Sequence, residues 1–216
     1  MRFDLYFTRT DQQNAANARS EWGTSMKYRY SHQMAGMLLL AGTILLGGCL
    51  PADEPPPTAE EMIERGRYLV TVAGCNDCHT PKVFSGGGMG LDESRLLSGH
   101  PADVEIPEFS FDQVGPGEWI LFNEHLTAAV GPWGVSFSAN LTPDEETGIG
   151  DWTEEEFIGA VQTGTHLGIG RPLLPPMPWF NLVIATEEDL QAMFAYLKSI
   201  PAIENQVPDS IDPPPM

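Results

Sequence analysis

One short run of residues has an obvious chemical use. Cys75, Cys78 and His79 form the pattern Cys-x-x-Cys-His. Two thiols one helical turn apart can each add to a vinyl group of a porphyrin, and the imidazole that follows can bind the porphyrin iron. The pattern therefore predicts one covalently bound haem c, attached through Cys75 and Cys78, with His79 as an axial ligand of the iron.

Two other uses of a Cys-x-x-Cys pair fit this sequence less well. A redox disulfide of the thioredoxin kind is expected in a strand-helix-strand setting, whereas the residues before Cys75 have a helical pattern. A tetrahedral zinc site needs further ligands, and the third cysteine, Cys49, lies at the end of an apolar leader. Haem attachment is the favoured interpretation.

Three helices are predicted to position this motif. The first covers residues 59–72 and leads directly into the Cys-x-x-Cys-His run. The second begins after Thr153, whose sequence context is a full capping box, and Gly164 is its expected C-cap. The third begins after Thr186 and stops before Pro201. Strands and helices do not alternate along the chain, so we expect an all-α fold.

Three helices around a buried macrocycle, the first carrying the attachment motif and the last rich in aromatic residues, resemble the class I cytochrome c fold. In that family the first and last helices cross, and the haem supplies much of the core. The resemblance implies that Gly66 or Ala73 allows a close crossing, with Phe194 or Tyr196 as its aromatic partner.

The same resemblance implies a methionine as the second axial ligand, on a loop before the last helix. Met177 fits, because it lies in the run Pro175-Pro176-Met177-Pro178-Trp179. Prolines on both sides restrict the backbone and would hold the thioether in place. The competitors have simpler explanations as core, loop, surface or supporting residues: Met193, Met89, His100, His125 and His166.

Further segments resemble the cytochrome subunits of membrane-associated bacterial alcohol, sugar-acid and nicotinate dehydrogenases. They are residues 138–144, 147–152 and 170–172, and the likeness extends over about residues 62–203. Those subunits typically carry three haem domains, whereas this chain has one Cys-x-x-Cys-His run. The resemblance implies that Asn140, Trp152 and Arg171 contact the haem propionates. An ordinary loop or packing role is the alternative for each.

An insertion over about residues 81–137 makes the domain longer than a minimal cytochrome c domain. Within it, residues 119–130, a turn at Gly131-Pro132, and the alternating Trp133, Val135 and Phe137 predict a hairpin. We interpret the insertion as a cover for the haem edge. A docking surface for a partner protein is the alternative.

The first 48 residues have the pattern of an export leader. An apolar stretch over residues 37–48, about 12 residues long and too short to cross a bilayer, follows Lys27 and Arg29. Its end, residues 46–49, resembles the lipobox of bacterial lipoproteins, which implies lipidation of Cys49. An ordinary cleavage site is the alternative. Because residues 1–25 are polar, we expect translation to start at Met26.

Proline-rich segments flank the expected domain. Residues 49–58 predict a lipid anchor followed by a stiff spacer, residues 59–205 the cytochrome domain, and residues 206–216 a loosely ordered tail.

The chain is strongly acidic. It has 30 acidic and 11 basic residues, of which the leader holds 3 and 5, so that residues 49–216 carry a formal charge of −21. Such a charge repels nucleic acid and anionic headgroups and favours partners with basic docking patches, whose binding weakens as salt rises. General solubility or a salty habitat is an equally good explanation of the charge.

These observations predict a mono-haem electron carrier rather than an enzyme. It would be anchored by lipid to the inner or outer membrane of a bacterial envelope and face the periplasm. It would carry one electron from a dehydrogenase or quinol-oxidising complex to a terminal acceptor. A fixed electron-transfer subunit of such a complex is the alternative. A peroxidase or small-molecule reductase would need an open distal position, which a clamped Met177 disfavours.

Overall fold

The computed structural model describes residues 55–215. The predicted leader, the lipidation site Cys49 and the first part of the spacer lie outside the described residues. The described chain holds helices α2 (Ala59–Val72), α3 (Cys75–His79), α4 (Glu154–Thr163) and α5 (Glu187–Ser199). Its strands are β1 (Lys82–Ser85), β2 (Gly88–Leu91), β3 (Leu121–Phe122), β4 (Ala128–Gly131) and β5 (Gly134–Phe137). Within residues 55–215, no helix is both long and apolar enough to cross a membrane.

The three long helices lie where their capping signals predict. Thr153 and Glu156 form the predicted capping box at the start of α4, and Gly164 ends that helix in the left-handed conformation. A second capping box, between Thr58 and Glu61, starts α2. Thr186 caps α5 by accepting a hydrogen bond from the backbone N–H of Asp189. Local chemistry therefore sets the helix starts.

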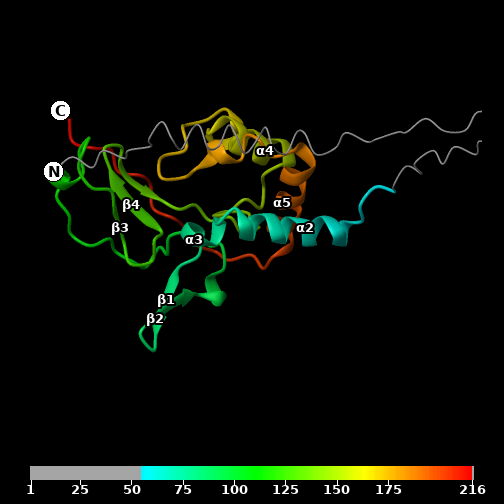
Figure 1. Cartoon of the computed structure of the whole chain (residues 1–216), viewed down its shortest axis with the longest axis horizontal. Helices are drawn as coiled ribbons and strands as arrows, with labels where there is room; N and C mark the ends of the chain where they lie inside the picture. Colours follow the sequence, from blue (N-terminus) through cyan, green and yellow to red (C-terminus); the bar gives the residue numbers. More distant parts are fainter. Residues whose placement is uncertain (1–54, 216) are drawn as a thin grey trace, which may run out of the picture. The chain divides into compact units, whose positions relative to one another are not determined.

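Helices α2 and α5 cross closely, as Figure 1 shows. At the crossing, a Cβ atom on Gly66 would lie 1.8 Å from the carbonyl oxygen of Ala192 and 2.8 Å from Cβ of Tyr196. An ion pair between Arg65 and Asp189, 2.8 Å long, joins the two helices nearby. The predicted roles of Gly66 and Tyr196 are confirmed, whereas Phe194 packs on the ring of Phe157 with 5.3 Å between centroids.

A single apolar cluster lies among the helices and supports the attachment segment. Its buried members come from α2, α4, α5 and the loops between them: Val70, Leu97, Ile149, Phe157, Val161, Leu190, Met193, Phe194 and Leu197. Cys75 packs against this cluster. The helical core therefore fixes the position of the attachment motif.

The expected all-α fold is not confirmed, because the insertion forms two antiparallel sheets. Strands β3, β4 and β5 pair in that order, and β1 pairs with β2. The predicted hairpin is present: β4 and β5 pair from Ala128↔Phe137 to Gly131↔Gly134. The β1–β2 hairpin was not predicted. Its turn residues Gly86 and Gly87 have φ of 59° and 82°, so glycines that suggested a loose loop instead supply the positive φ of a tight turn.

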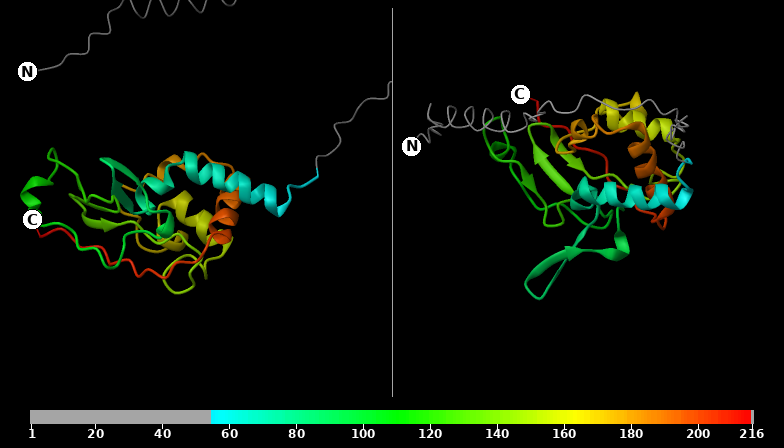
Figure 2. Two further views of the ribbon diagram at one scale, coloured as in Figure 1. Left: turned by 90° about the horizontal axis from the view of Figure 1, so that it is seen from below. Right: turned by 45° about the vertical axis from the view of Figure 1, so that its right-hand side comes forward.

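The C-terminal strap, which we define as residues 201–215, lies against the domain instead of being loosely ordered. Figure 2 shows the strap running past the sheet of β3, β4 and β5 towards the C-terminus. The backbone of Ile211 exchanges two hydrogen bonds with Val135 of β5. The side chain of Asn205 donates to the carbonyls of Ser98 and His100 and accepts from the N–H of Ala102. The strap therefore ties the loop that follows β2 to the sheet.

Replacing Asn205 by alanine should loosen this connection. The change removes three hydrogen bonds at a half-buried position, and we expect the free energy of unfolding to fall by about 2 kcal/mol. Urea unfolding measures this change. The control is Gln206→Ala, because Gln206 is exposed and its side chain bonds only to the neighbouring Val207 carbonyl. Equal unfolding midpoints for the two variants would show that Asn205 does not hold the strap.

Candidate haem site

The attachment segment is a short, firmly held helix. Gly74, with φ of 71°, turns the chain between α2 and α3. Helix α3 then places Cys75 and Cys78 on one face, three residues apart. Thr80 fixes its far end, because its hydroxyl donates to Oδ1 of Asn76 over 2.9 Å and accepts from the N–H of Leu97 over 2.8 Å. Both thiols are free and half-buried.

The acid–base character of these thiols differs from that of a redox disulfide pair. Burial raises the pKa of Cys75 to about 11, and burial together with the charge of Asp77 raises the pKa of Cys78. Disulfide oxidoreductases instead lower the pKa of the attacking thiol so that it is a thiolate near neutral pH. The setting favours the haem interpretation over the redox one.

His79 is oriented by the backbone of a distant segment. Its side chain is 9% exposed, and Nδ1 donates a 2.8 Å hydrogen bond to the carbonyl of Ala139. Burial lowers the pKa of His79 against the raising effect of this bond, so the neutral imidazole is favoured. A neutral imidazole whose Nδ1 carries the proton leaves Nε2 as the metal-binding atom. His79 thus fits an iron ligand with a supporting carbonyl behind it.

Met177 lies on the predicted proline-rich loop and is half-buried. We call residues 171–178 the methionine loop. Leu173 N–H donates to the carbonyl of Gly164 at the start of the loop, and Met177 N–H donates to Leu174 over 3.3 Å. After the loop, the ring of Trp179 packs so tightly on Gly164 that a Cβ there would lie 2.2 Å from it. The loop is therefore anchored to the end of α4.

Large apolar side chains remain uncovered on both sides of the methionine loop. Ile169 is 93% exposed before it, and Phe180 and Ile184 are 62% and 90% exposed after it. Two free thiols and a neutral imidazole in one short helix, together with a thioether on the proline-rich loop, are the donor set of a covalently bound haem, so the residues present fit the implied haem.

The three predicted propionate contacts have different surroundings. Asn140 is 3% exposed, and its amide is engaged with Thr142, Thr147 and the carbonyl of Ile203. Trp152 is half-buried and meets the ring of His166 edge-on, with 5.1 Å between centroids. Arg171 is exposed, and within residues 55–215 its guanidinium has no hydrogen bond or ion pair. Within residues 55–215, the guanidinium of Arg171 and the indole N–H of Trp152 therefore have unused donors, whereas the amide of Asn140 is engaged.

Comparison with known proteins gives the site its context. No family model matches the chain. Residues of the chain align over 165 positions, at 30% identity, with the fructose dehydrogenase cytochrome subunit of Gluconobacter japonicus, covering 76% of this chain and 26% of that protein. The chain is similar to the cytochrome c subunits of bacterial dehydrogenases.

Two other relatives extend the comparison of this cytochrome c-like chain. A nicotinate dehydrogenase subunit from Pseudomonas putida is 28% identical over 149 residues, which are 68% of this chain and 9% of that protein. A diheme cytochrome c-type protein from Cereibacter sphaeroides is 30% identical over 177 residues, which are 79% of this chain and 44% of that protein. The chain spans less than half the length of each of these three relatives.

The residues that compete with Met177 as the second iron ligand have surroundings of their own. Met193 is buried in the helical core, and Met89 lies exposed on β2. His100 is fully buried, with Nδ1 bonded to the hydroxyl of Thr127 and Nε2 to the carbonyl of Val104. His125 bonds to the backbone of Lys82. Among these histidines, His166 is the one beside a predicted site residue, Trp152.

Lys82 is a supporting residue that our sequence reasoning missed. Its side chain is buried, and Nζ donates to the carbonyls of Asn76, Asp77 and Thr80 at the end of α3. Burial lowers its pKa. A cation at this position complements the negative end of the helix dipole. A lysine shortly after the Cys-x-x-Cys-His run could therefore have indicated this supporting role. The carbonyl of Ala139, which accepts from His79, could not be found in this way, because every residue has a backbone carbonyl.

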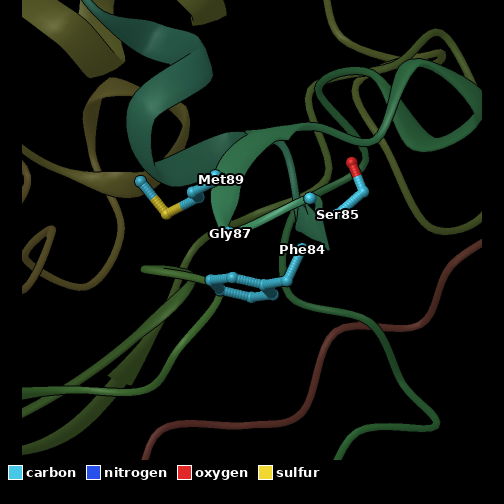
Figure 3. Close-up of a pocket in the computed structure, with 6 residues that line it drawn as sticks. Phe84, Ser85, Gly87 and Met89 are labelled. Carbon is cyan, nitrogen blue, oxygen red and sulfur yellow. The ribbon is translucent and has the colours of Figure 1, made fainter.

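The β1–β2 hairpin projects from the domain directly after the attachment helix (Figure 1). Phe84 and Met89 are cross-strand neighbours, both half-exposed, and with the glycine turn they line a shallow hollow (Figure 3). Residues 83–91 carry no charged side chain in an otherwise acidic chain. The hairpin is therefore an uncharged, apolar projection beside the candidate site.

Proposed function

We propose that residues 59–205 bind one haem c and carry one electron at a time. In this proposal Cys75 and Cys78 would hold the haem through thioethers, and His79 and Met177 would be the ligands of its iron. The bound haem supplies the one-electron chemistry, and the protein holds its ligands and limits access to the iron. The observation that carries the proposal is the 2.8 Å bond from Nδ1 of His79 to Ala139, next to two free thiols.

Ligation of the iron by both His79 and Met177 would suit an electron carrier rather than an enzyme. Two strong axial ligands leave no coordination position for a substrate, and a methionine raises the reduction potential. Electron transfer then needs only an exposed haem edge and a small, transient interface. We further propose that Arg171 contacts a haem propionate, since it is the first residue of the methionine loop and its guanidinium is exposed. Asn140 and Trp152 stay in the proposal as weaker candidates.

The cellular setting is proposed from the leader. A signal peptide within residues 1–48 and a lipidated Cys49 would place the domain on the periplasmic side of a membrane. The redox partners would be a dehydrogenase or quinol-oxidising complex on one side and a terminal acceptor on the other. The acidic charge of the chain favours a partner with a basic docking surface. An apolar patch within that surface of the partner would contact the uncharged β1–β2 hairpin.

A fixed subunit of a dehydrogenase complex is the second candidate. The names of several relatives favour it, because those proteins are cytochrome subunits of fructose, alcohol and gluconate dehydrogenases. Mild detergent extraction from the native membrane separates the two cases. A fixed subunit co-purifies with a dehydrogenase in a constant ratio, whereas a free carrier is recovered alone.

The test of the proposal is a spectrum of the intact protein made together with the haem-attachment machinery. We expect one haem per chain that resists extraction by acidified acetone, a low-spin spectrum in both oxidation states, and no binding of carbon monoxide by the reduced form. Haem that is extracted freely would overturn covalent attachment. Stoichiometric binding of carbon monoxide would overturn the carrier assignment and favour an enzyme with an open distal position.

A further inference from the structure

One short segment, which begins at the end of the insertion and continues two residues beyond it, bonds both to His79 and to the loop that carries Met177. We call residues 136–139 the connecting segment. It begins in β5, where the hydroxyl of Ser136 donates a 2.6 Å hydrogen bond to the carbonyl of Pro175, two residues before Met177. It ends at Ala139, whose carbonyl accepts the hydrogen bond from His79.

The direction of the Ser136 bond follows from its neighbours. The indole Nε1–H of Trp133 points at Oγ of Ser136 over 3.2 Å, and an indole nitrogen can only donate. Oγ therefore accepts from Trp133 and has one proton left to give. The carbonyl of Pro175 lies 2.6 Å away, whereas the carbonyl of Ala129 lies 3.4 Å away. The hydroxyl proton is accordingly directed to the methionine loop.

The methionine loop has few other long-range attachments. Its prolines have no backbone N–H, which removes donors that would otherwise tie it down. The bonds of Arg171 and Leu173 hold the start of the loop to the segment just before it. Among the described residues, the Ser136 bond is the one hydrogen bond from residues 174–178 to a distant part of the chain.

The connecting segment itself is firmly held. Strand β5 pairs with β4 on one side, and the C-terminal strap pairs with Val135 through Ile211. Ser138 N–H donates to Thr127, and the carbonyl of Ser138 accepts from His100. A firmly held segment that bonds to the methionine loop at one end and to His79 at the other can fix their separation.

We propose that Ser136 is a positioning residue that holds Met177 on the iron, and that the connecting segment acts as a brace between the two proposed ligands. This inference rests on the proposed ligation by His79 and Met177. It assigns the insertion a mechanical role that neither a cover for the haem edge nor a docking surface requires. Loss of the Ser136 bond would let the methionine loop move away and expose the iron to small ligands.

The test is a titration of the oxidised protein with imidazole, which must displace Met177 in order to bind. We expect Ser136→Ala to bind imidazole about 2- to 10-fold more tightly than the wild type, the effect of one ordinary hydrogen bond on an equilibrium. Ser136→Cys keeps a similar volume and a weaker donor, so it should lie between the two. The matched control is Ser138→Ala, because that hydroxyl makes no hydrogen bond within residues 55–215.

Met177→Ala serves as the reference for an iron with no methionine to displace. If Ser136→Ala equals the wild type while Met177→Ala binds far more tightly, the ligation stands and the role of Ser136 is overturned. Equal shifts in Ser136→Ala and Ser138→Ala would also overturn it, since they would indicate general loosening of β5. If Met177→Ala equals the wild type, Met177 is not the ligand, and the proposed ligation fails together with this inference.

Discussion

Replacing Met177 by alanine should convert the iron from a low-spin form with two protein ligands to a high-spin form open to small molecules. Alanine offers no donor atom, and the prolines on either side restrict the backbone changes by which another residue could take its place. We expect complete loss of the far-red sulfur-to-iron band of the oxidised protein. We also expect the reduced protein to gain stoichiometric binding of carbon monoxide and the reduction potential to fall, because methionine ligation raises it.

The matched control for this variant is Met89→Ala. Met89 lies exposed on β2, so its loss should leave the spectra unchanged. An unchanged spectrum for Met177→Ala would mean that another residue binds the iron. His166 would then be the first to replace, because it packs on Trp152, itself a predicted site residue. That result would reopen the choice between carrier and catalyst.

The helices could be predicted because their determinants are local. Thr153 and Glu156 satisfy each other's backbone groups within one turn, and Gly164 supplies the left-handed residue that ends the helix. The same holds for the attachment motif, in which three side chains within five residues carry the signal. Such features need no knowledge of the rest of the fold.

The sheets and the strap were harder to predict because distant contacts decide them. Gly86 and Gly87 are compatible with a flexible loop or a tight turn, and pairing of β1 with β2 selects the turn. The proline content of residues 206–216 suggests a loose tail, yet the backbone of Ile211 forms hydrogen bonds with Val135, more than 70 residues earlier in the chain. Amino-acid composition indicates the backbone preferences of the strap, but it does not identify the residues with which the strap forms hydrogen bonds.

The candidate site likewise has parts that the sequence predicts and parts that depend on distant contacts. The proposed ligands come from side-chain types with recognisable spacing. Their supports are the backbone carbonyls of Ala139 and Pro175, which any residue could provide. Only the folded chain brings these two carbonyls together with His79 and Ser136.

Replacing Gly66 by alanine should strongly destabilise the domain. In most helices this change stabilises, by up to about 1 kcal/mol, because alanine is the better helix former. Here the added Cβ would lie 1.8 Å from the carbonyl oxygen of Ala192, and that oxygen belongs to the backbone of α5 and cannot rotate away. The helices must separate, which we expect to cost about 3 kcal/mol or more of the free energy of unfolding. Urea or thermal unfolding of the two proteins measures the difference.

The matched control is Gly159→Ala, which adds the same methyl group inside α4. Its Cβ would lie 3.2 Å from Cα of Gly168, a contact that a small shift of the loop relieves, so the gain in helix propensity should roughly offset the crowding. Equal unfolding midpoints for the two variants would contradict a close crossing of α2 and α5 at Gly66. A large loss confined to Gly66→Ala would show that the crossing stabilises the fold. Because α2 ends immediately before the turn at Gly74, separating the helices would also move Cys75 away from the core that supports it.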